Sequence, residues 1–288
     1  MSRIAYVQGE FVPLEEARIS VLDRGFIFAD GVYEVTAVLN GGLVDNEHHL
    51  ARLQRSLGEI ELSCPVSMEE LTRLQLDLVR RNALTEGGVY LQITRGAAER
   101  DFAFPEGDVE PSLVMFTQAR QIVDSPDARN GIAVKSVDDI RWRRRDIKSV
   151  ALLAQVLAKQ EAVAAGCREA WMVEDGHVTE GASSSAFIIT RDGAIVARPL
   201  SHEILASVTR KSVLALAAEE NLVIEERRFT LEEAFAAAEA FNCSASGFVL
   251  PVVRIDGKAV ADGAPGPLTK RLRDLYIAHA RETATYSA

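Results

Sequence analysis

The sequence predicts an α+β fold of two domains. Three observations support this prediction. The first half mixes β-hairpins with two amphipathic helices, residues 119–130 lose periodicity and contain Pro126, and strands and helices resume after them. A chain of 288 residues is long enough for one or two domains. We therefore expect an N-terminal α+β domain over 1–118, a linker over 119–130 and a C-terminal domain over 131–288.

The first half shows clear strand and helix signals. Asn40-Gly41-Gly42 predicts a hairpin turn after a strand. Asn46 is expected to cap a helix that runs to about Leu62, and the capping box of Ser67 and Glu70 opens another helix. Alternating apolar residues predict strands at 3–8, 31–39, 89–94 and 112–118.

The second half alternates strands with helices. A long apolar-rich segment after Lys148 predicts a helix over about 149–165, which ends at Gly166. The capping box of Thr230 and Glu233 predicts a short helix. Other helices are expected at about 207–220 and 268–284, and strands at 131–137, 168–174, 186–190, 194–198, 222–228, 239–244 and 248–255.

Composition excludes several classes of protein. Apolar residues make up 48% and charged residues 26%, as in globular proteins, and the net charge of −10 argues against nucleic acid or an anionic membrane as partner. No apolar stretch reaches the ~18 residues of a membrane span. Three widely spaced cysteines form no disulfide or metal pattern, which suits a reducing cytoplasm, and the histidines lack metal-ligand spacing.

Lys148 and Glu180 are the strongest candidates for chemistry. An unprotonated lysine amine can hold an aldehyde cofactor as a Schiff base, and a carboxylate can keep a pyridine nitrogen protonated. The small residues after Glu180, Gly181 to Ser185, would let the backbone approach a flat ring. Each piece also has a structural interpretation, because a lysine at a helix start is usually solvated and such a run is often a linker.

The basic run Arg141 to Arg145 is interrupted by Trp142. One interpretation is a solvated loop, and the other is a functional cluster that supplies positive charge beside Lys148.

These motifs together resemble the fold-type IV pyridoxal-phosphate enzymes, the class IV aminotransferase family. The resemblance rests on D-I-K-S around Lys148, L-x-K-Q in the helix and V-T-E-G-x-S-S around Glu180, and it covers nearly the whole chain. LDRGFIFADGVYEV, VYLQITRGAAER and DGAPGPLTKRL are closest to the D-amino acid aminotransferase subfamily. The resemblance implies an N-terminal α/β sandwich, a C-terminal pseudo-barrel that carries the lysine, and pyridoxal 5'-phosphate at the domain interface.

The resemblance also assigns cofactor-binding residues. Lys148 would be the Schiff-base lysine and general base, and Glu180 would hold the ring nitrogen. Leu205, an ordinary core residue by pattern, would pack on the ring. The residues assigned to the phosphate are Arg52, Val208, Thr209, Ser244 and Ala245. Position alone makes Arg52 a solvated helix residue, and Ala245 stands where the family usually has threonine, so it would donate only its backbone N–H.

Three residues are assigned to the substrate. Tyr33, which by pattern is a half-buried strand residue, would contact the substrate, and so would Ser184. Arg100 would reach in from the neighbouring subunit of a homodimer and bind the α-carboxylate of the substrate. The family's histidine two positions after this arginine is Phe102 here. This change leaves room for substrates with a weaker demand for a carboxylate, including primary amines.

The implied activity is transamination between a D-amino acid and a 2-oxo acid in the cytoplasm, without a metal. Alternatives of the same fold are a branched-chain L-amino acid or (R)-amine transaminase and aminodeoxychorismate lyase. A catalytically silent ligand sensor is an alternative from another class, which the intact pair of Lys148 and Glu180 disfavours.

Overall fold

The computed structural model describes residues 2–286, which group by their contacts into two compact units. The first unit consists of 2–121, 147–151 and 280–286, and the second of 122–146 and 152–279. The segment that carries Lys148 therefore belongs to the first unit, whereas we expected it in the C-terminal domain. The limits of the linker at 119–130 stay a prediction.

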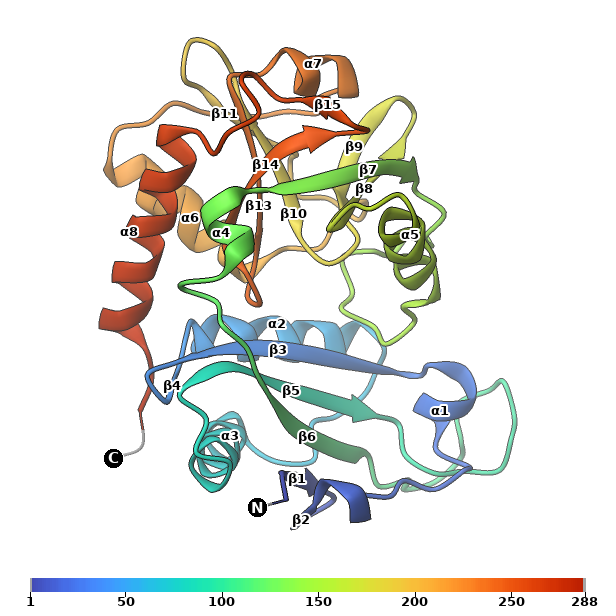
Figure 1. Cartoon of the computed structure of the whole chain (residues 1–288). Coiled ribbons are helices and arrows are strands. Elements are labelled where there is room, and N and C mark those ends of the chain that lie inside the picture. The colour runs from blue at the N-terminus through green and yellow to red at the C-terminus, as the bar shows by residue number, and fades with distance from the viewer. Residues whose placement is uncertain (1, 287–288) are drawn as a thin grey trace. The chain divides into compact units, whose positions relative to one another are not determined.

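The first unit is built on an antiparallel sheet with the strand order β2-β1-β6-β5-β3-β4 (Figure 1). Its strands are β1 (Ile4–Val7), β2 (Glu10–Pro13), β3 (Gly31–Leu39), β4 (Gly42–Leu43), β5 (Glu86–Thr94) and β6 (Ser112–Ala119). Its helices are α1 (Arg24–Phe28), α2 (Asn46–Glu59), α3 (Met68–Arg81) and the 3-10 helix η1 (Leu14–Glu16). Leucines of α2 and α3 pack with inward residues of β3 and β5, so one face of the sheet forms the core.

Local signals placed most of these elements. The limits predicted for β3 are confirmed, and the Ser67 side chain accepts a hydrogen bond from the Glu70 N–H at the start of α3. The prediction that Asn46 caps α2 is wrong. Asp45 is the capping position, with φ of 52° and no side-chain cap, while Asn46 is the first helical residue and donates to Thr72.

The second unit is built on a mixed, curled sheet with the order β12-β11-β10-β13-β14-β7-β8-β9, and β15 pairs with β14 (Figure 1). Its strands are β7 (Ile132–Asp138), β8 (Glu169–Glu174), β9 (His177–Gly181), β10 (Ser185–Ile189), β11 (Ile195–Ala197), β12 (Ile224–Glu226), β13 (Glu239–Ser244), β14 (Phe248–Ile255) and β15 (Lys258–Ala259). Its helices are α4 (Pro126–Asn130), α5 (Leu153–Ala164), α6 (Val208–Glu219), α7 (Leu231–Ala236) and α8 (Pro267–Thr283), whose last residues group with the first unit.

The prediction that a helix starts directly after Lys148 is wrong. Helix α5 begins at Leu153, because the residues after Lys148 pair with β3 instead. Ser149 forms a bridge with Val32, and the Val150 N–H donates to the Gly31 carbonyl at 3.1 Å. Backbone groups used in this pairing are not available for helical hydrogen bonds.

Two further sequence signals can be compared with the structure. The stretch 119–130, expected as a linker, contains α4, a short helix that Ser125 caps at its start. The capping box of Thr230 and Glu233 is confirmed at the start of α7. Within residues 2–286, no helix is long and apolar enough to cross a membrane.

Candidate functional site

Lys148 is held by its backbone between β3 and α2. Its carbonyl accepts a hydrogen bond from the Tyr33 N–H at 3.0 Å, and its own N–H donates to the Ser56 hydroxyl of α2 at 3.3 Å. The Nζ atom lies 4.3 Å from the centroid of the Tyr33 ring. The structure therefore brings together two of the predicted residues, Lys148 and Tyr33.

Arg52 lies in the same unit and is not solvated as its helix position suggested. Its guanidinium makes two bonds of 2.7 Å to the Glu34 carboxylate on β3, and the exposed fractions of the two side chains are 10% and 1%. His49 Nδ1 lies 2.8 Å from the same carboxylate. Burial alone would raise the pKa of Glu34, but the charge and hydrogen bonds of Arg52, with His49, hold it well below its usual range. The guanidinium is thus held in one orientation.

Arg100 lies elsewhere in the first unit, in the exposed loop after β5. Its guanidinium lies 5.4 Å from the centroid of the Phe28 ring and 5.5 Å from that of Phe102. Phe102 is itself 80% exposed. Among the described contacts of Arg100, none joins it to Lys148 or Tyr33, so the structure does not bring this predicted substrate residue to the lysine.

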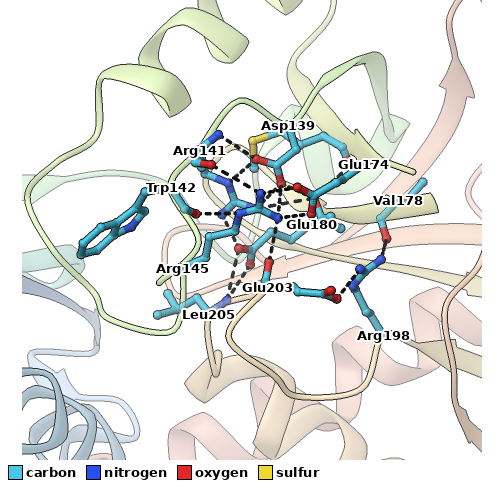
Figure 2. Close-up of polar contacts among 12 residues, drawn as sticks. Asp139, Arg141, Trp142, Arg145, Glu174, Val178, Glu180, Arg198, Glu203 and Leu205 are labelled. Carbon is cyan, nitrogen blue, oxygen red and sulfur yellow. Dashed lines mark hydrogen bonds and ion pairs between the residues drawn. The ribbon is translucent and has the colours of Figure 1, made fainter. Parts of the chain in front are cut away.

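In the second unit, Glu180 lies on β9 with its carboxylate buried (Figure 2). The Leu205 N–H points at this carboxylate, 3.2 Å from Oε1 and 3.4 Å from Oε2. Arg141 donates to Oε1 at 2.5 Å. Burial raises the pKa of Glu180, and the charge of Arg141 offsets this effect only in part. Two predicted residues, Glu180 and Leu205, are therefore in direct contact.

Arg141 and Arg145 were not identified individually from the sequence. The solvated-loop interpretation is wrong for both, because their side chains are 5% and 3% exposed and both pair with Asp139. Arg143 is exposed, as that interpretation expected. The functional interpretation placed positive charge beside Lys148, and this stays a prediction; the structure shows that Arg141 contacts Glu180. Asp139, two positions before Arg141, was the available signal for a buried pair.

The turn after Glu180 is close-packed. A Cβ atom on Gly181 would lie 2.2 Å from the Ser184 hydroxyl oxygen, so glycine is required for the present position of that hydroxyl. The Ser184 Oγ is buried and has no hydrogen-bond partner among the described residues. A buried polar atom without a partner costs free energy, and a bound ligand can satisfy it. The hydroxyl of the predicted substrate residue Ser184 is therefore available to form a hydrogen bond with a ligand.

Two neighbouring segments of the second unit, the start of α6 and the turn after β13, offer donors for an anion. Helix α6 begins at Val208, so the N–H groups of Val208 and Thr209 have no acceptor within the helix. Ser207 before them interacts with the Cys243 thiol, and Cys243 pairs with Ser185 across β10 and β13. Ser244 and Ala245 follow directly, and the Ser244 hydroxyl lies 3.4 Å from that of Ser246. The start of a helix and a serine-rich turn are typical of phosphate sites.

The predicted residues thus divide between the two units. The first unit contains Lys148, Tyr33, Arg52 and Arg100. The second contains the residues around the ends of β9 and β13, namely Glu180, Ser184, Leu205, Val208, Thr209, Ser244 and Ala245. In residues 2–286, no group of three His, Cys, Asp or Glu side chains is arranged to hold a metal ion.

Comparison with known proteins gives consistent matches. The model of the family "Amino-transferase class IV" matches residues 31–255. The chain is 40% identical over 271 residues to the D-alanine aminotransferase of Staphylococcus haemolyticus, covering 93% of this chain and 95% of that protein. It is 39% identical over 265 residues to the D-alanine aminotransferase of Bacillus licheniformis, covering 92% and 93%.

Solved structures show the same fold. The branched-chain amino acid aminotransferase of T.th. with pyridoxamine 5'-phosphate superposes with a TM-score of 0.90 at 26% identity, and 99% of each chain is covered. The expected fold of the resembling family is therefore confirmed.

Proposed function

Because the chain belongs to the class IV aminotransferases, we propose that it transfers the amino group of a D-amino acid, such as D-alanine or D-glutamate, to a 2-oxo acid such as pyruvate or 2-oxoglutarate, with pyridoxal 5'-phosphate as cofactor. The observation that carries the choice of donor is the 40% identity to a D-alanine aminotransferase over 93% of the chain. The T.th. enzyme of the same fold was solved with pyridoxamine 5'-phosphate, which supports this choice of cofactor.

The residues present fit this cofactor. The Ser184 hydroxyl, which has no partner among the described residues, and the open start of α6 offer donors to it. Arg52 and the N–H groups of Val208 and Thr209 would hold the phosphate, together with Ser244 and Ala245. When bound, the cofactor supplies an electron-withdrawing ring that stabilises negative charge on the substrate Cα.

Lys148 acts as the base in this proposal. Its Nζ, which lies 4.3 Å from the centroid of the Tyr33 ring, takes the proton from the substrate Cα. Glu180 holds a proton on the ring nitrogen, Leu205 keeps the Glu180 carboxylate in place through its N–H, and Tyr33 with Ser184 orients the substrate. The substrate carboxylate is bound by the guanidinium fork of Arg100 from a second copy of the chain.

Replacement of Lys148 by alanine tests this assignment. We expect the variant to lose turnover and to lose the pyridoxyl label that borohydride leaves on the wild-type peptide. Lys270, an exposed lysine of α8, gives the matched control Lys270→Ala, which should keep both. Wild-type transamination in the Lys148 variant, or a label on another peptide, would refute the role of Lys148.

The identity of the donor is tested with D- and L-amino acids against pyruvate and 2-oxoglutarate. A branched-chain L-amino acid is the second candidate donor, because the T.th. enzyme shares the fold at a TM-score of 0.90. Activity with L-leucine and none with D-alanine would overturn the proposed specificity. Activity with a primary amine that lacks a carboxylate would instead support the interpretation that Phe102, in place of the family's histidine, weakens the demand for a carboxylate.

We also propose that the chain is a homodimer in which the Arg100 loop completes the partner's substrate site. Apolar side chains near this loop are exposed, among them Phe26 at 76% and Phe102 at 80%, and α5 also exposes Leu153 and Val156. A monomeric mass in light scattering would contradict the dimer. The free cysteines support a cytoplasmic location, which fractionation of cells would test.

A further inference from the structure

A row of alternating charges runs through the interior of the second unit and ends at Glu180 (Figure 2). Arg145 bonds to Glu174 at 2.7 and 2.9 Å, and its Nη1 lies 3.2 Å from Asp139. Asp139 in turn accepts from Arg141 at 2.9 and 2.7 Å, and Arg141 donates to Glu180 at 2.5 Å. The order along the row is therefore acid, base, acid, base, acid.

The formal charges of this row do not cancel. Three carboxylates face two guanidinium groups, so the row has a net charge of −1 when all five are ionised. The side chain of Glu174 at one end is 36% exposed to solvent, whereas that of Glu180 at the other end is 8% exposed. Glu180 is therefore the buried carboxylate whose negative charge is only partly balanced by a nearby cation. A buried charge is stable only when it is paired, so Glu180 requires a further cationic partner.

Arg141 is not free to neutralise Glu180 completely, because it is shared. Its Nε and Nη2 atoms bond to Asp139, and only Nη1 reaches Glu180. Asp139 is fixed by the Thr179 hydroxyl at 2.6 Å, and Thr179 is the residue directly before Glu180 on β9. Arg141 is thus anchored on one side, and its charge is presented to one oxygen of the Glu180 carboxylate.

We propose that Arg141, oriented by Asp139 and Thr179, is a positioning residue that keeps Glu180 ionised toward a cationic ring nitrogen. This inference deepens the proposed function and rests on it, since it takes Glu180 as the residue opposite the ring nitrogen of the cofactor. The cation nearest the carboxylate favours the state in which the shared proton is on nitrogen and the charge is on oxygen. Without Arg141, the proton moves to the Glu180 oxygen, and the neutral ring withdraws electrons less strongly.

The location of this proton can be measured directly. Pyridoxal phosphate labelled with ¹⁵N at the ring nitrogen is loaded into wild-type protein and the variants Arg141→Met, Arg141→Lys, Asp139→Asn and Glu180→Gln. The ¹⁵N chemical shift distinguishes pyridinium from neutral pyridine. Arg198→Met is the matched control, because Arg198 is also buried but bonds to Val178 and Glu203 and has no described contact with Glu180 or Asp139.

The wild type and Arg198→Met should give the pyridinium shift, and Arg141→Met should move most of the way to the neutral value. Arg141→Lys keeps the charge and should move less. The kcat of Arg141→Met should fall by about tenfold or more, with KM changed by less than about threefold, because the loss is in the reaction step rather than in binding.

A purely structural role predicts a different result. If Arg141→Met lowers the melting temperature but keeps the pyridinium shift and wild-type kcat, the inference is overturned. Should that variant not fold, Asp139→Asn retains the arginine without its anchor, and an unchanged shift there also overturns the inference. If Glu180→Gln leaves the shift unchanged, the proposed role of Glu180 itself fails, so the two failures are distinguishable.

Discussion

Replacing Glu34 with glutamine should lower the stability of the first unit by about 3 kcal/mol, because breaking a buried ion pair by removing one partner typically costs ~3–5 kcal/mol. Glu34 is 1% exposed and makes two bonds of 2.7 Å to Arg52. We place the loss at the lower end because an amide oxygen still accepts one bond and Arg52 retains 10% exposure. The corresponding decrease in melting temperature is about 6–12 °C.

The effect has a defined pH dependence. The pKa of Glu34 is lowered in the folded protein, so its ionised form stabilises the fold. This stabilisation is fully present above the unfolded carboxyl pKa of about 4.3 and is lost as pH falls through the lower folded value. The difference in stability between wild type and Glu34→Gln should therefore be constant above about pH 6 and should shrink in acid.

Circular dichroism melts of the cofactor-free protein measure this difference. The control is Glu70→Gln on α3, since Glu70 pairs with Arg73 at 2.5 Å on the surface, where ion pairs contribute little. The control should melt like wild type. Equal melting temperatures for Glu34→Gln and Glu70→Gln would show that the buried pair does not stabilise the fold as argued.

Two other predictions concern single positions. Gly87→Ala should destabilise the first unit by about 1–3 kcal/mol in denaturant titrations, because the added Cβ would lie 2.1 Å from the Gln118 carbonyl oxygen. Gly58→Ala meets open space and should stabilise α2 by up to about 1 kcal/mol. Stability changes of the same sign in both variants would contradict this steric argument. Glu180→Gln should leave the cofactor-free protein at least as stable as wild type at pH 8. The pKa of Glu180 is raised in the folded protein, so its ionisation costs stability as pH rises above the pKa of the unfolded chain. A melting temperature lower than that of wild type would contradict this prediction.

Local signals in the sequence were sufficient for many elements of the fold. Alternation and the Asn40-Gly41-Gly42 turn located β3, and the capping boxes located the starts of α3 and α7. The same alternation contained an unused signal. Glu34 lies on the face of β3 that also carries Val32 and Val38, so a charged side chain was directed into the core and required a partner. Arg52 on α2 is that partner.

What the sequence did not reveal depends on contacts between distant segments. The start of α5 was placed too early because Ser149 and Val150 bind the backbone of β3, which lies far away along the chain. The burial of Arg141 depends on Glu180, which β9 supplies. A basic run has the same composition whether it is solvated or paired, so composition could not distinguish the two interpretations.

The two buried glutamates differ in a way that separates a stabilising pair from a binding group. Glu34 receives two bonds from Arg52 and a contact from His49, and its pKa is lowered. Glu180 receives one bond from an arginine shared with Asp139, and burial raises its pKa. Two similar ion pairs therefore have opposite consequences, because only Glu34 has its full counter-charge within the fold. A buried carboxylate that destabilises the protein unless a cation arrives is expected at a ligand site, and this deficit favours Glu180 rather than Glu34 as the residue that meets the ring nitrogen.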